Sequence, residues 1–157
     1  MGDITITTWI DAPQEVCFDL ARDVAAHAES AAFSGERLVA PGRLDGILET
    51  GDLVCFEGRH FGMRQRFCAR ITHVDRPHLF VDEMVEGIFR RLRHDHEFTP
   101  SNGGTLMTDR LVWTAPLGLL GTIADSLFLA RHMTWFVRTK QSHLKTIAEQ
   151  RSSRVSS

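Results

Sequence analysis

The sequence predicts a single α+β domain in which a seven-stranded antiparallel sheet is covered by one long C-terminal helix. Three observations support this fold class. Strand-like segments follow one another with short separators, two short helical segments interrupt them after the first strand, and the last third holds one long amphipathic pattern. A chain of 157 residues suits one domain. We place that domain at residues 1–150 and expect a frayed polar tail at 151–157.

The strands are predicted from alternation and from the turn residues that separate them. Residues 3–10 alternate and are rich in Ile and Thr. Asp11 is expected to cap a short helix over 13–22, with Pro13 in its first turn, and an Ala-rich helix covers about 23–32. The other strands are expected near 34–40, 52–61, 64–74, 78–86, 88–99 and 104–114. Their Gly-, Pro- and Asp-rich separators are short, so neighbouring strands must be antiparallel.

The C-terminal helix is predicted over about 122–150 from a period near 3.6. Its apolar stripe is Ile123, Leu127, Ala130, Met133, Val137, Leu144 and Ala148. The apolar loop 115–122 before it has three interpretations: it closes one mouth of a cavity, packs under the helix start, or forms a homodimer contact.

Composition excludes several classes of protein. The chain has 18 basic and 20 acidic residues, so it carries no global field that would attract nucleic acid or an anionic membrane. Three cysteines without CxxC spacing argue against a disulfide framework and favour small core residues in a reducing compartment. The N-terminus lacks the pattern of a signal peptide, and the uncharged stretch 111–124 is too short to span a bilayer. We therefore expect a cytoplasmic protein without an integral membrane segment.

Strand alternation divides the sheet into a charged face and an apolar face that carries histidines and carboxylates. Of the eight histidines, only His60, His94 and His96 are expected to point toward the apolar face. Phe89 is assigned to the charged, wet face, where Arg91 and Arg93 form a cross-strand mosaic of charges with Glu83. The predicted pocket-facing residues are Phe56, His60, Phe67, Phe80, Asp82, Met84, Arg90, Leu92, His94, His96, Met107, Asp109, Leu111 and Trp113 on the strands, with Met133 and Val137 on the helix.

The register of the last hairpin suggests which polar side chains meet. If the turn pairs Phe98 with Thr105, His96 lies opposite Met107 and His94 lies opposite Asp109. The same register places Asp82 near Leu92, diagonal to His94. A slip of two residues changes these partners but not the face.

Several motifs, in order, carry a resemblance to a known superfamily. These are Trp9-Ile-Asp-Ala-Pro-Gln-Glu-Val-Cys-Phe18, Gly51-Asp-Leu-Val-Cys-Phe56, Asp75-Arg-Pro-His-Leu-Phe80 with Asp82-Glu-Met84, His94-Asp-His-Glu-Phe98 with Gly103-Gly-Thr105 and Thr108-Asp109, and Pro116-Leu-Gly118. Over residues 3–150 the chain resembles the START-like (SRPBCC) superfamily with its helix-grip fold, which includes birch-pollen-type (Bet v 1-like) and polyketide cyclase/dehydrase proteins, and it is most similar to an uncharacterised bacterial branch. The resemblance implies a cavity for an apolar small molecule between sheet and helix. It transfers no catalytic residue.

Three functions remain open from the sequence. The first is binding of an apolar lipid, aromatic or polyketide-like compound by the pocket-facing residues. The second is a cyclase/dehydratase-type enzyme with His94 as base and Asp109 as the residue that orients it. The third is a structural or regulatory protein with a filled core, in which the histidines and carboxylates only tie the hairpins together; a cavity below about 100 Å³ would favour it. His60, His94, His96 and a carboxylate have metal-ligand chemistry, but no diagnostic spacing such as HExxH is present, so no metal and no cofactor is assigned.

Overall fold

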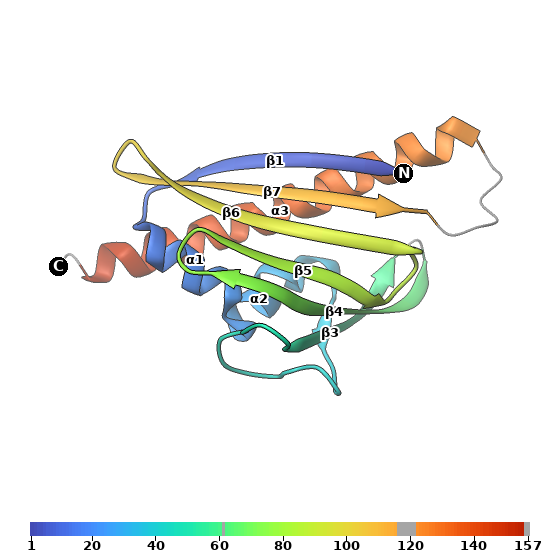
Figure 1. The fold of residues 1–157 in the computed structure, drawn as a ribbon, viewed down its shortest axis with the longest axis horizontal. Coiled ribbons are helices and arrows are strands. Elements are labelled where there is room, and N and C mark those ends of the chain that lie inside the picture. Colours follow the sequence, from blue (N-terminus) through green and yellow to red (C-terminus); the bar gives the residue numbers. More distant parts are fainter. Residues whose placement is uncertain (61, 116–121, 156–157) are drawn as a thin grey trace.

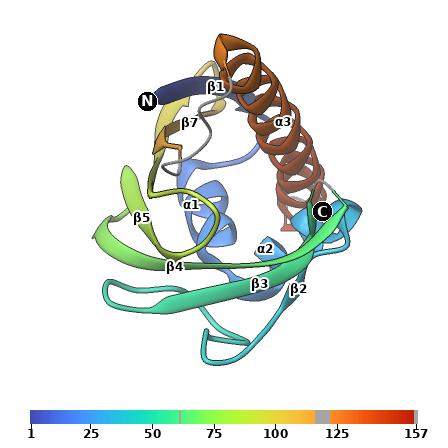
Figure 2. The same ribbon diagram turned by 90° about the vertical axis from the view of Figure 1, so that its right-hand side faces the viewer.

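The computed structural model shows one sheet curled around one long helix (Figures 1 and 2). It describes the chain except for residues 61, 116–121 and 156–157, and for residues 60, 122–126 and 155 it describes only the backbone. The sheet is antiparallel throughout, with the strand order β1-β7-β6-β5-β4-β3-β2. Figure 2 shows the C-terminal helix crossing the open side of the curled sheet, with the two short helices at one end.

The elements follow the predicted order. The strands are β1 (Gly2–Ile10), β2 (Arg37–Leu38), β3 (Leu53–His60), β4 (Met63–Asp75), β5 (Leu79–Glu86), β6 (Arg91–Ser101) and β7 (Gly104–Thr114). The helices are α1 (Gln14–Arg22), α2 (Val24–Ala31), the 3₁₀ turn η1 (Ala32–Ser34) and α3 (Thr122–Val155). This arrangement is the α+β helix-grip fold that the sequence predicts. Helix α3 continues through 151–155, residues for which the sequence predicts fraying.

Two apolar clusters fill the space between the sheet and α3. One gathers around Phe18, Phe80 and Phe98 beneath α1 and the C-terminal half of α3. The other gathers around Leu92, Leu111 and Trp113 beneath the N-terminal half of α3. The edge-to-face contacts of Phe18 with Phe80 and Phe98, at 5.8 and 5.4 Å between ring centroids, fix the first cluster.

The register of the last hairpin differs by two residues from the prediction. Phe98 pairs with Met107, His96 with Asp109 and His94 with Leu111, because β6 and β7 continue to Ser101 and Gly104. A tight turn at Asn102-Gly103, with both residues at positive φ (49° and 79°), then closes the hairpin. The predicted neighbour of Asp82 is also wrong, since Asp82 lies directly opposite His94. The side of the sheet that each of these side chains faces is unaffected, because a register shift of two residues preserves the face.

Two local predictions about the helices are wrong. Asp11 does not cap α1, because the N-cap residue is Pro13 without a side-chain hydrogen bond, and the Asp11 backbone N–H donates to Glu149 instead. Asp23 caps α2 by accepting from the Ala26 N–H. Leu127 of the predicted apolar stripe is 63% exposed, whereas Val137, Leu144 and Ala148 are buried. Ala130 and Met133 pack against the second apolar cluster, so the stripe faces the core from Ala130 onward.

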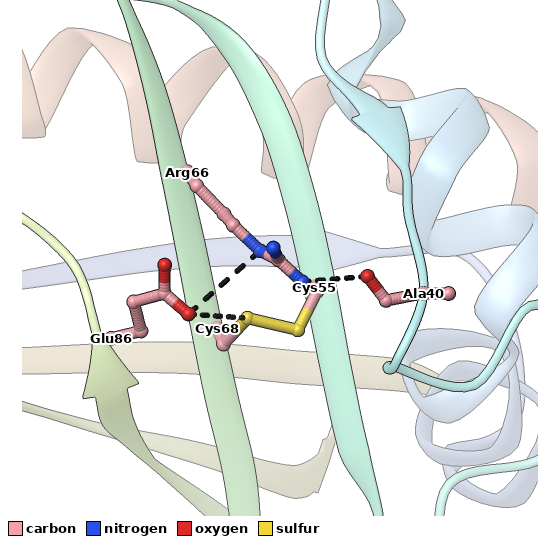
Figure 3. Close-up of a disulfide and its surroundings, with 5 residues drawn as sticks. All are labelled: Ala40, Cys55, Arg66, Cys68 and Glu86. Carbon is pink, nitrogen blue, oxygen red and sulfur yellow. Dashed lines mark hydrogen bonds and ion pairs between the residues drawn. A yellow bond between two sulfur atoms is a disulfide. The ribbon is translucent and has the colours of Figure 1, made fainter.

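The cysteines also differ from the prediction: Cys55 and Cys68 form a disulfide (Figure 3). They are directly paired across β3 and β4, with their Cα atoms 4.1 Å apart. Both are buried as expected, although they alternate with cavity-facing neighbours and so lie on the outer face of the sheet. Arg66 donates to the Ala40 carbonyl beside them (Figure 3). Because disulfides persist in oxidising surroundings, the cysteines no longer argue for a reducing compartment.

The charged face is the predicted mosaic of cross-strand ion pairs. Glu83 lies between Arg91 and Arg93, at 3.7 and 3.8 Å, and Arg93 contacts Asp95 at 2.9 Å. These contacts agree with the interpretation of the arginine-rich segment as part of a cross-strand mosaic of charges. Among the helices that the structure describes, none combines the length and the apolar character needed to cross a bilayer.

Candidate functional site

A cavity of about 130 Å³ lies between the sheet and α3, where the two apolar clusters meet. Its walls are mostly apolar side chains, and Asp82 and His94 form a polar section. It reaches the surface beside Ile88, which is 38% exposed. The volume exceeds the ~100 Å³ below which we expected a filled core, yet lies under the ~300 Å³ of ordinary ligand pockets.

Most of the residues predicted for the pocket face gather at this cavity or directly behind it. The predicted residues that line it are Phe56, Phe67, Phe80, Asp82, Leu92, His94, Leu111, Met133 and Val137. His96, Met107 and Asp109, together with His94, line a second cavity of about 20 Å³ that also touches α1, α2 and α3. That volume is about the size of one water molecule.

The remaining predicted residues are placed elsewhere. Met84 and Trp113 pack in the second apolar cluster and do not line the cavity. Arg90 is exposed in the bend that precedes β6, so its predicted place on the pocket face is wrong. The same bend turns Phe89, predicted for the wet face, into the cavity wall. The side chain of His60 and the loop 116–121 lie outside the described residues.

Two carboxylates and two imidazoles form a buried cluster at the polar section of the wall. The rings of His94 and His96 lie against each other with their centroids 3.7 Å apart and their planes tilted by 34°. His96 also stacks on Phe80, with 4.1 Å between centroids. Asp82 lies at one end of the pair: its Oδ2 is 2.9 Å from His96 Nε2 and 3.9 Å from His94 Nδ1. Asp109 lies at the other end: its Oδ1 is 2.6 Å from His96 Nδ1 and 3.2 Å from His94 Nε2. Each ring thus bridges the two carboxylates.

The two imidazoles differ in protonation. Burial alone lowers the pKa of His96, but the charges and hydrogen bonds of Asp109 and Asp82 outweigh it and raise that pKa to about 9. Burial, together with repulsion from His96, lowers the pKa of His94. Burial raises the pKa of Asp82 and Asp109, yet the adjacent imidazoles outweigh it and lower both values. At neutral pH His96 is therefore an imidazolium between two carboxylates, and His94 is neutral.

Helix α3 completes the site with residues that the sequence analysis did not identify. The Gln141 amide donates to Asp109 Oδ2 at 2.7 Å and accepts from the Thr8 hydroxyl at 2.7 Å, so it joins α3 to β7 and β1. Lys140 lines both cavities and donates to His27 Nε2, and burial lowers the pKa of both groups. His27 and His132 line the larger cavity, although only His60, His94 and His96 were expected to face it. Strand alternation carries no signal for them, because they lie on helices.

Comparison with solved structures gives independent support for the fold. The protein TTHA0849 of Thermus thermophilus superposes with a TM-score of 0.74 at 19% identity, covering 99% of this chain and 100% of that one. The di-domain ARO/CYC StfQ from the steffimycin biosynthetic pathway gives 0.73 at 15% identity, covering 96% of this chain and 51% of StfQ. Major latex-like protein 151 of Panax ginseng gives 0.66 at 14% identity, covering 94% and 97%. No family profile and no curated protein matches the chain.

These similarities identify the class of fold. The chain has the START-like helix-grip fold of Bet v 1-like and polyketide cyclase-like proteins, as the sequence motifs indicate. At such low identity the likeness extends to architecture and not to any particular reaction.

Proposed function

We propose that the protein binds an apolar small molecule in the cavity between the sheet and α3, with one polar group of that ligand against Asp82 and His94. The observation that carries the proposal is the composition of the cavity wall, in which mostly apolar side chains surround a few polar groups, with Asp82 and His94 adjacent to each other. Ligand sites typically combine an apolar lining with a few convergent polar groups.

The size of the cavity limits the ligand. An apolar cavity of ~150 Å³ is enough to hold benzene, so about one ring or a short aliphatic segment fits the 130 Å³ found here. Phe67, Met133 and Phe136 are partly buried side chains on its wall, and Met in particular adapts to different shapes. The ligand class is therefore an aromatic, lipid or polyketide-like compound that inserts one ring or chain segment.

Titration with toluene and phenol tests both parts of the proposal. Both should bind, and phenol should bind about 2–10-fold more tightly because its hydroxyl gains one hydrogen bond at the polar wall. His94→Leu should remove the advantage of phenol, and Ala69→Leu, which adds bulk at a buried wall position, should weaken both.

Matched changes outside the cavity serve as controls. His73→Leu and Ala25→Leu alter exposed positions and should leave both affinities unchanged. Absence of saturable binding in the native protein, or equal binding by Ala69→Leu, would contradict the proposal.

A second candidate function is acid–base catalysis of the cyclase/dehydratase type, which the contact between Asp109 and His94 supports. Asp109 lies 3.2 Å from His94 Nε2 and so favours the proton on that nitrogen. The lone pair of a neutral His94 is then on Nδ1, on a residue that lines the cavity. A general base at neutral pH needs such an unprotonated, oriented imidazole. The structural similarity to the ARO/CYC protein StfQ makes a polyketide-like compound the substrate class to try.

The catalytic candidate is tested by incubating the protein with a polyketide-like compound and following cyclised or dehydrated products. His94→Gln should abolish turnover while His73→Gln retains it, with circular dichroism confirming that both fold. An unchanged rate in His94→Gln would refute the role of His94.

A further inference from the structure

We propose that Asp82, His94 and His96 form a binding site for a divalent first-row transition-metal ion, with Zn²⁺ as the simplest occupant. One oxygen or nitrogen atom from each of these side chains lies within 4.8 Å of the other two. Two imidazoles and a carboxylate are a ligand set used for Zn²⁺ and, with open positions, for non-haem Fe²⁺. This site goes beyond ligand binding in the cavity and does not depend on it.

The distances on the Asp82 side suit ligands of one ion. Ligands 2.0–2.2 Å from an ion lie roughly 3–3.5 Å apart in tetrahedral or octahedral arrangements. Asp82 Oδ2 is 2.9 Å from His96 Nε2 and 3.9 Å from His94 Nδ1, values that bracket this range. Small rotations of the two adjacent imidazole rings therefore bring all three atoms to ligand positions.

Asp109 fits the role of the residue that orients the two ligands. It lies near the opposite ring nitrogens, His94 Nε2 and His96 Nδ1, at 3.2 and 2.6 Å. Metal-bound histidines usually donate their other ring N–H to a carboxylate, which fixes the tautomer and turns the remaining lone pair toward the ion. Asp109 is itself held by the Gln141 amide at 2.7 Å. Two strands and α3 thus supply both the ligands and their support.

Buried charge provides a further argument. The cluster holds two carboxylates, both less than 10% exposed, and a divalent ion would balance both charges at once.

One side of the proposed metal site faces the cavity. Asp82 and His94 line the cavity wall, so an ion between them leaves a coordination position for water or for an oxygen of a cavity ligand. The His94 Nδ1 lone pair would bind the ion. Acid–base catalysis by His94 needs the same lone pair to accept a proton. Metal binding and that form of catalysis are therefore alternatives, and Zn²⁺ should inhibit any activity that depends on a free His94.

The test is titration of EDTA-treated, tag-free protein with Zn²⁺ and with Co²⁺, without any organic ligand. We expect one ion per chain with an affinity tighter than micromolar, visible d–d absorption from bound Co²⁺, and a higher melting temperature with saturating Zn²⁺. Imidazole ¹⁵N signals of His94 Nδ1 and His96 Nε2 should shift on Zn²⁺ addition.

Variants separate this site from surface histidines. Asp82→Asn keeps the side-chain shape and a hydrogen-bond acceptor for His96, and it should weaken Zn²⁺ binding by more than the ~10–100-fold expected for Asp109→Asn, which alters only the orienting carboxylate. His73→Gln removes an exposed histidine and should change nothing. The proposal is overturned if native protein shows no saturable binding of either ion, or if Asp82→Asn binds as tightly as native.

Discussion

Gln141 joins the long helix to the sheet, and replacing it with leucine should destabilise the whole fold. Its side chain is 1% exposed and donates to Asp109 Oδ2 at 2.7 Å. It also accepts from the Thr8 hydroxyl at 2.7 Å and donates to the Ile6 carbonyl at 3.3 Å. Gln141→Leu keeps a side chain of similar size but removes all three hydrogen bonds.

The size of the effect follows from the partners that are left buried. A hydrogen bond to a charged group contributes about 1.5–3 kcal/mol and a neutral one about 0.5–1.5 kcal/mol. Losing the Asp109 and Thr8 bonds should therefore lower the free energy of unfolding by about 2–4 kcal/mol. With an m value of about 2 kcal/mol per molar urea, the unfolding midpoint falls by roughly 1–2 M.

Urea unfolding followed by circular dichroism measures this change. Gln150→Leu, an exposed position on the same helix, is the matched control and should shift the midpoint little. In an Asp109→Asn background the cost of Gln141→Leu should shrink, because a charged partner is no longer left unpaired. The reasoning is refuted if Gln141→Leu and Gln150→Leu have the same midpoint.

Three further predictions concern the core, the disulfide and an ion pair. Phe80→Ala, at a side chain 1% exposed, should cost about 3–5 kcal/mol in urea unfolding, while Val85→Ala at a 54% exposed position should cost little. Cys55→Ala/Cys68→Ala should cost about 3 kcal/mol by the loop-closure argument, and a native mass that includes two extra hydrogens would contradict the disulfide. Hydrogen bonds from Arg76 lower the pKa of Asp19, so this carboxylate adds stability above its unfolded pKa of about 3.9 and loses it as pH falls through the folded value. Asp19→Asn should accordingly flatten the fall in melting temperature between about pH 5 and pH 3, and an unchanged slope would count against the pair.

The candidate site was partly predictable from strand alternation. Alternation placed Asp82, His94, His96 and Asp109 on one face, and that placement survived a register error of two residues because a slip of two preserves the face. Which of these side chains meet depended on the turn. The Asn102-Gly103 turn lengthened the hairpin and set His96 against Asp109, a pairing that the predicted strand ends at 99 and 104 did not suggest.

Other parts of the site had no sequence signal. Arg90 and Phe89 exchanged places because the chain bends before β6 begins at Arg91, and alternation holds only inside a strand. His27, Lys140 and Gln141 reach the cavities from helices whose rotation about the sheet is set by packing. The Cys55–Cys68 pair required the register of β3 and β4.

The sequence by itself determined the α+β class, the order of the elements, and the apolar face with its buried acids and histidines, because hydrophobic period and turn chemistry are local properties of the chain. Tertiary structure decided the cavity, the disulfide and the adjacent imidazoles between two carboxylates. Those features depend on register and on how α3 lies across the sheet. Both are set by contacts between residues far apart in the sequence, which no local pattern encodes.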